Sequence, residues 1–150
     1  MERRHFLLAL GALLPLGGCA SHGFVSGGLP KIEQGDASAE VQVFREGHVS
    51  RAFETMYIAL DGNRILQLGI TQAGVFKVPV GKHVIGARFS LGLSLSDEKA
   101  EFVAEPGQTY AFLCHTNVLG DGPRIVIERI STEDAAWRLK TSFSTYRQED

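Results

Sequence analysis

Short apolar runs, interrupted at nearly regular intervals, constrain the fold of this chain more than any other feature. From residue 39 onward, runs rich in Val, Ile, Phe and Tyr alternate with Gly, Pro, Asp and Asn at a spacing of roughly ten residues. Runs of this length suit strands and are too short for most helices, so the pattern predicts an all-β antiparallel sandwich. The predicted strands are residues 40–45, 56–60, 64–68, 75–80, 83–90, 99–104, 109–115 and 124–130.

Alternation within two of these runs predicts which side chains face the core. Successive side chains of a strand point to opposite faces, so every second residue shares a face. The predicted inner faces carry Phe76, Val78 and Val80 in one strand and Ile85, Ala87 and Phe89 in the next.

Turn residues between the runs predict how the strands connect. Asp61-Gly62-Asn63 separates two apolar runs and predicts a tight hairpin, because Gly and Asn tolerate positive φ. Gly81-Lys82 is predicted to join the following pair in the same way. Pro79 has no backbone N–H, so its strand is expected to lie at a sheet edge or to bend there.

The last part of the sandwich region changes from a strand pattern to a helix pattern. Ser131-Thr132-Glu133-Asp134 supplies a hydroxyl cap and acidic residues for a first turn, and Ala135 and Leu139 follow. One short C-terminal helix is therefore predicted to cover the sheet. Trp137 is expected to fill a gap in the core rather than to serve as a ligand platform.

The N-terminus has the order of an export signal. Arg3 and Arg4 precede an almost wholly apolar run over residues 6–16, and Gly17-Gly18 lies directly before Cys19. The apolar run has about eleven residues, whereas a membrane-spanning helix needs roughly 20. The segment is therefore interpreted as a removable signal peptide.

Leu16-Gly17-Gly18-Cys19 resembles the lipobox of bacterial lipoproteins. The resemblance implies cleavage before Cys19, lipid attachment to its sulfur and a protein held in a membrane without spanning it. Ala20 follows the cysteine, which by similarity to the sorting rule of Gram-negative lipoproteins suggests the outer membrane, facing the periplasm. Residues 3–7 also resemble the twin-arginine pattern, so both the general secretory and the twin-arginine export routes stay open.

These observations divide the chain into four segments. Residues 1–18 are predicted to be the signal peptide, and residues 19–38 the lipidated cysteine and a flexible tether rich in Gly and Pro. Residues 39–143 are predicted to form the sandwich with its helix, and residues 144–150 a tail. Contact of His22 or Phe24 in the tether with a partner is the alternative to a plain spacer.

Four stretches of the predicted sandwich carry a family resemblance, and they are residues 41–45, 57–62, 74–85 and 104–110. Together they are similar to a family of bacterial lipoproteins known as a domain of unknown function, over residues 39–139. The middle portion also resembles the PEGA-type repeat, a small β-sandwich module, so the implied fold is PEGA-like or prealbumin-like. The resemblance implies no catalytic, cofactor-binding or metal-binding residues.

Cys114 is the one cysteine left in the domain if Cys19 carries lipid, so no intramolecular disulfide is expected. Alternation puts Cys114 on a face with Tyr110 and Phe112 and puts His115 on the opposite face. A buried core thiol is therefore predicted, and a nucleophile or an intermolecular pair is the alternative. Gly92-Leu93-Ser94-Leu95-Ser96 lacks the second glycine of a hydrolase elbow, which counts against a serine nucleophile.

Histidines and acids give no clear constellation for chemistry. The four histidines of the mature chain are spaced far apart, which disfavours a zinc site, and His83 is interpreted as a solvated or hydrogen-bonded structural residue. Alternation puts several of the clustered acids on a solvent face, against a paired-carboxylate glycosidase. The histidines are His22, His48, His83 and His115, and the acids are Asp97, Glu98, Glu101 and Glu105.

The function expected from the sequence is noncatalytic binding at the cell envelope. The net charge of −2, with scattered Lys and Arg, makes nucleic acid an unlikely partner. No glycine loop follows a strand and opens a helix, so no nucleotide cofactor is expected. The expected partners are an envelope protein or glycan, with Leu91, Leu93 and Leu95 as a candidate contact loop. The alternative is an envelope hydrolase whose site is assembled from distant loops.

Overall fold

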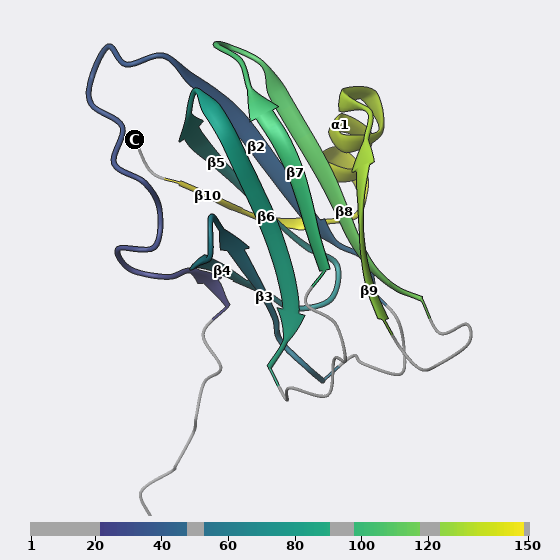
Figure 1. Ribbon diagram of the computed structural model, residues 1–150. Coiled ribbons are helices and arrows are strands. Elements are labelled where there is room, and N and C mark those ends of the chain that lie inside the picture. The colour runs from purple at the N-terminus through teal and green to yellow at the C-terminus, as the bar shows by residue number, and fades with distance from the viewer. Residues whose placement is uncertain (1–21, 48–52, 91–97, 118–123, 149–150) are drawn as a thin grey trace, which may run out of the picture.

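The predicted apolar runs form the strands of two sheets that face each other across one core (Figure 1). The computed structural model describes residues 22–47, 53–90, 98–117 and 124–148. Its elements are β1 (Gly23–Phe24), β2 (Ser38–Arg45), β3 (Met56–Leu60), β4 (Asn63–Leu68), β5 (Gln72–Pro79), β6 (Gly81–Phe89), β7 (Glu98–Ala104), β8 (Thr109–Asn117), β9 (Arg124–Ile130), α1 (Thr132–Thr141) and β10 (Ser144–Arg147). The all-β sandwich with one short helix is thereby confirmed, and the eight strands expected from the sequence are all present.

Sheet A has the order β1-β4-β3-β6-β7 and is antiparallel throughout. Sheet B has the order β10-β5-β2-β8-β9. It is mixed, because β2 runs parallel to β8 and β10 runs parallel to β5. The sandwich therefore departs from a purely antiparallel one in these two pairs.

Side chains from the inner faces of both sheets fill the space between them. Phe76 and Val78 of sheet B and Ile85, Ala87 and Phe89 of sheet A are buried in this core, as alternation predicted. At roughly 25 cal/mol per Å² of apolar surface removed from water, such burial is the main stabilising contribution.

Helix α1 packs on the outer face of sheet B. Ser131 caps it, since its hydroxyl oxygen accepts a hydrogen bond from the Asp134 amide at 3.1 Å. Ala135 is buried against the sheet and Leu139, one turn later, is half-buried. The predicted cap and helix are confirmed.

The expectation that Trp137 lies in the core is wrong, because its side chain is 58% exposed. Residues advance about 100° around a helix, so Trp137 is about 200° from Ala135 and points away from the sheet. Its size suggested burial, but its helical phase relative to Ala135 decides its exposure.

The connection at Gly81 also differs from the prediction. Gly81 does not close a hairpin, since β5 belongs to sheet B and β6 to sheet A. The chain crosses between the sheets at Val80 and Gly81, where Gly81 has φ +133°. Val80 consequently leaves the predicted inner face and is 44% exposed. Pro79 is the last residue of β5, beyond the part that pairs with β10.

Two segments that were predicted to lie outside the sandwich contribute strands to it. Gly23 and Phe24 form β1 beside β4, and the Phe24 ring packs edge-on against Phe76, at 6.2 Å between centroids. At the other end, β10 pairs with β5 and Tyr146 packs against the core. Both strands are too short to show a sequence period, which is why a tether and a tail were expected there.

Across the described residues, we find no helix with the length and apolar character that crossing a bilayer requires.

Candidate functional site

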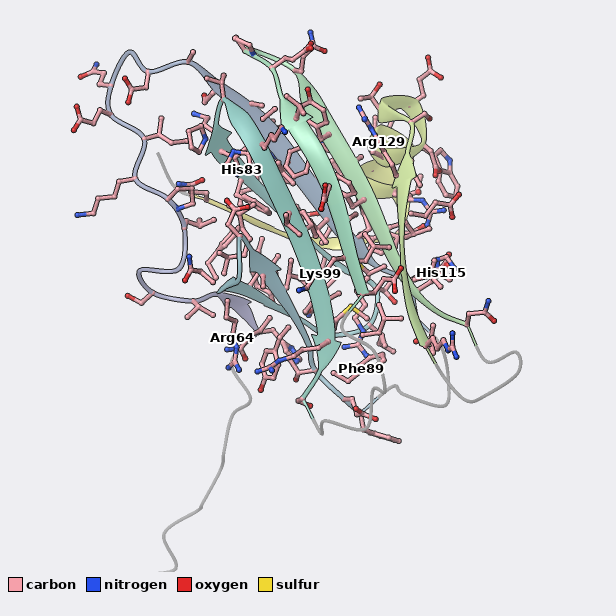
Figure 2. The ribbon with its side chains drawn as sticks, in the orientation of Figure 1. Arg64, His83, Phe89, Lys99, His115 and Arg129 are labelled. Carbon is pink, nitrogen blue, oxygen red and sulfur yellow. The ribbon has the colours of Figure 1, made fainter. Side chains whose placement is uncertain are left out.

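The outer face of sheet A presents a row of four residues in register, with a cation at each end. Arg64 of β4 pairs with Ala59 of β3, Ala59 pairs with Gly86 of β6, and Gly86 pairs with Lys99 of β7. Arg64 and Lys99 are exposed and lie on different strands of the same sheet (Figure 2). Since neighbouring strands are about 4.8 Å apart, the ends of the row are roughly 14 Å apart at the backbone.

The two small residues of this row form the floor of a shallow depression. Its volume is about 250 Å³. The small side chains of Ala59 and Gly86 leave the space, and larger polar side chains surround it. Those that line it include Tyr57, Arg64, Arg88 and Lys99. We refer to it as the basic depression.

A β-bulge turns Arg64 toward this face. The register shifts between Ile58 and Ala59, so that Ile58 is opposite Leu66 while Ala59 is opposite Arg64. Ile65 is the extra residue, and it is buried. Without the bulge, Arg64 would share the inward face of Leu66. A bulge that re-aims a side chain in this manner is common beside functional sites.

Arg64 is held in place by the ring of Tyr57. The guanidinium carbon lies 3.9 Å from the ring centroid, a cation–π contact. In a stacked guanidinium the N–H groups lie in the plane and remain able to bind a carboxylate or phosphate. Tyr57 is opposite Arg88 on β6, so one aromatic ring has an arginine beside it on each neighbouring strand.

The hairpin that carries the site is fixed by His83. Its Nδ1 is 2.7 Å from Oδ2 of Asp61, and its Nε2 is 2.8 Å from the carbonyl oxygen of Pro79. Asp61 Oδ1 also accepts from the Val84 amide, and Asp61 and Gly62 both have positive φ, as a tight hairpin turn requires. The sequence prediction of a hydrogen-bonded structural His83 is confirmed.

A second depression has a volume of about 450 Å³. It lies between residues 25–30 and the β3–β4 hairpin, and we refer to it as the polar depression. Arg64 lines both depressions. The polar groups of its wall belong to Ser26, Asp61 and Asn63, together with the backbone of Gly27 and Gly28.

Cys114 lies on the core face of β8 with Tyr110 and Phe112, as predicted, and it is fully buried. Burial raises the pKa of its thiol to about 12, although the nearby charge of Arg45 opposes the shift. A thiol in this state is neutral and unreactive at physiological pH.

We therefore expect the Cys114 thiol of the native protein to resist a water-soluble alkylating reagent at pH 8. Labelling should become at least about 100-fold faster in denaturant, because unfolding exposes the sulfur and restores its ordinary pKa. Mass spectrometry of timed samples measures both rates. Native labelling as fast as that of the unfolded chain would contradict the buried thiol.

Glu98 and Glu101 of β7, two of the clustered acids, do not form a pair. Glu101 points to the outer face of β7 and is exposed, while Glu98 points inward and is half-buried. His115 lies on the outer face of β8, away from Cys114. Within the described residues, no group of three His, Cys, Asp or Glu side chains is placed to hold a metal ion.

Several predicted residues lie outside the described part of the chain. They are Cys19, the lipid attachment residue, His48, Asp97, the Gly92–Ser96 stretch and the leucines Leu91, Leu93 and Leu95. Sequence reasoning did not select Tyr57, Arg64, Arg88 or Lys99. These residues come together only because β4, β3, β6 and β7 are neighbours in sheet A. Their spacing in the sequence therefore could not predict that they form one row.

Comparison of this chain with family models, with characterised proteins and with solved structures finds no match. Its function is therefore argued from its own residues. The basic depression has positive charge, hydrogen-bond donors and one aromatic ring on a hydrogen-bonded sheet. These features suit a surface that binds anions.

Proposed function

We propose that this protein is a lipid-anchored lipoprotein of the bacterial envelope whose sandwich is a noncatalytic binding module. The lipid is attached to Cys19, and the outer membrane, on its periplasmic side, is the expected location. The ligand, an envelope glycan or protein, binds on the outer face of sheet A. The observation that carries the binding role is the row Arg64–Ala59–Gly86–Lys99, in which cations flank a floor of small residues.

The short connection to the lipid supports this assignment. Gly23 begins β1 four residues after Cys19, and a chain extends at most about 3.6 Å per residue. The sandwich is therefore held within about 15 Å of the lipid attachment site, at the β1 edge of sheet A. In this register Gly23 is opposite Gln67, and Gln67 is opposite Tyr57, so the binding face is close to the anchored edge.

In-cell photocrosslinking tests both parts of the proposal. A photoreactive residue replaces Glu101, which is exposed on the outer face of β7 two residues from Lys99, or, as the matched control, Trp137, which is exposed on α1. We expect envelope adducts from position 101 and few from position 137, because only the first lies on the proposed binding face. The intact mass of the same membrane preparation should correspond to a chain that begins at an acylated Cys19.

Equal adducts at both positions would contradict the assignment of the binding face. A mature protein that still carries residues 1–18, or one without acyl mass, would contradict the lipid anchor.

A further inference from the structure

The cations around the basic depression have no acidic partner among the described residues. Ion pairs there include those of His83 with Asp61 and of Arg138 with Glu46 and Asp134, and none of these contains Arg64, Arg88 or Lys99. On the outer face of β7 the nearest acid is Glu101, and it lies in the next row of the sheet, opposite Val84. Three positive charges around one small floor favour an anionic ligand.

Arg64 gives this anion a prepared contact. Its stacking on Tyr57 restricts the side chain before any ligand arrives, so less conformational entropy is lost on binding. The free edge of the guanidinium matches the two oxygens of a carboxylate or a phosphate, and such charge-assisted hydrogen bonds are the strong ones.

The polar depression extends the site beyond the size of a single anion. Because Arg64 lines both depressions, a ligand whose anionic group contacts Arg64 has the second depression within reach of its remaining groups. The wall there offers the Ser26 hydroxyl, the Asn63 amide and the Asp61 carboxylate, together with glycine backbone. These groups both donate and accept hydrogen bonds, which matches the hydroxyl groups of a sugar.

The topology disfavours an extended peptide as the ligand. Peptides that bind to sheets usually add a strand at a free edge, where backbone N–H and C=O groups are unpaired. Here β3 and β6, which carry the floor residues Ala59 and Gly86, are each paired on both sides. The face therefore offers side chains and not a backbone ladder.

We infer that the two depressions together bind an acidic saccharide. Its phosphate or carboxylate contacts Arg64, Arg88 and Lys99, and its hydroxyl groups occupy the polar depression. This inference rests on the proposed binding function and names the ligand class of that same face.

Titration of the full mature chain, purified from membranes in neutral detergent, tests the inference. The probes are glucose 1-phosphate, inorganic phosphate, glucose and an aspartate-rich peptide, and the dissociation constants come from calorimetry or NMR shifts. We expect glucose 1-phosphate to bind at least about tenfold more tightly than the other three, because only it uses both depressions.

Two variants locate the binding. Arg64→Ala should weaken glucose 1-phosphate binding about tenfold or more. Lys82→Ala removes an exposed cation of the same sheet that lies outside the depression, and it should change the affinity less than about twofold. Gly86→Val should abolish binding by filling the floor. An added Cβ at Gly86 has no heavy atom nearer than 3.8 Å, and β-branched residues favour strands, so this variant should melt at the native temperature or above.

If inorganic phosphate binds as tightly as glucose 1-phosphate, the sugar contributes nothing to binding. The inference of a saccharide ligand would then be wrong, and the site would bind simple anions. If the aspartate-rich peptide binds more tightly than glucose 1-phosphate, the inference of a saccharide is wrong and the ligand is an acidic protein segment. No binding of any probe would overturn the inference, whereas selective crosslinks from position 101 would in that case still support the proposed binding face. Unchanged binding in Gly86→Val would place the ligand elsewhere and overturn it as well.

Discussion

Arg45→Ala is expected to lower the free energy of unfolding by about 3 to 5 kcal/mol, a large part of the roughly 5 to 15 kcal/mol that stabilises a typical domain. Arg45 ends β2 and is only 2% exposed. Its Nη1 donates hydrogen bonds to the carbonyl oxygens of Glu54 and Leu68, at 2.5 and 2.6 Å. The side chain thus ties sheet B to β4 and to the segment that precedes β3.

The environment of Arg45 shows why its loss is costly. Burial lowers the pKa of the guanidinium to about 10, and the nearby Glu54 carboxylate opposes that shift. The side chain therefore stays charged at neutral pH, beside Glu54 and 5.5 Å from the ring centroid of Phe89. Its removal leaves a cavity, carbonyl groups that have lost their donor and an acidic group that has lost its cation.

Urea denaturation of the purified chain measures this change, with Arg88→Ala as the matched control. Arg88 is an exposed arginine of β6, so its truncation should change the free energy of unfolding by less than about 0.5 kcal/mol. Arg45→Lys keeps the charge but not the planar fork and should fall between the two. Equal stability of Arg45→Ala and Arg88→Ala would show that the buried guanidinium has no structural role.

The sequence predicts most of the fold because each long strand has its own local pattern of apolar residues and turn residues. Alternation and turn residues are enough for the eight long strands, the Asp61–Gly62 hairpin and the capped helix. The partners of each strand depend on contacts between distant residues. The crossing at Gly81 and the parallel pairing of β2 with β8 are therefore visible only in three dimensions.

The candidate site depends on a β-bulge and on strand pairing, and neither can be predicted from one strand alone. Regular alternation would turn Arg64 inward with Leu66 and Leu68, and the bulge at Ile65 reverses it. Lys99 meets the row because β7 pairs with β6, although 35 residues separate it from Arg64. By contrast, the burial of Cys114 follows from its position relative to Tyr110 and Phe112 in one strand, so sequence alone predicts it.

Gly74 and Leu66 are expected to show strong energetic coupling across the core. Gly74 of β5 faces β4, and a Cβ added there would overlap Cδ2 of Leu66, whose side chain is fully buried. Gly74→Ala should therefore cost about 1 to 3 kcal/mol of unfolding free energy through overpacking. Leu66→Ala should cost about 2 to 5 kcal/mol through the cavity that it leaves.

The double variant should be more stable than the sum of the two losses implies, by about 1 kcal/mol or more, because the new methyl group occupies space that Leu66 vacates. Urea denaturation of the four proteins of this cycle gives the coupling energy. Gly86→Ala is the matched control, since the same change on the outer face of sheet A meets no atom closer than 3.8 Å and should be neutral or stabilising. Strict additivity of Gly74→Ala and Leu66→Ala would mean that the sheets adjust their separation freely.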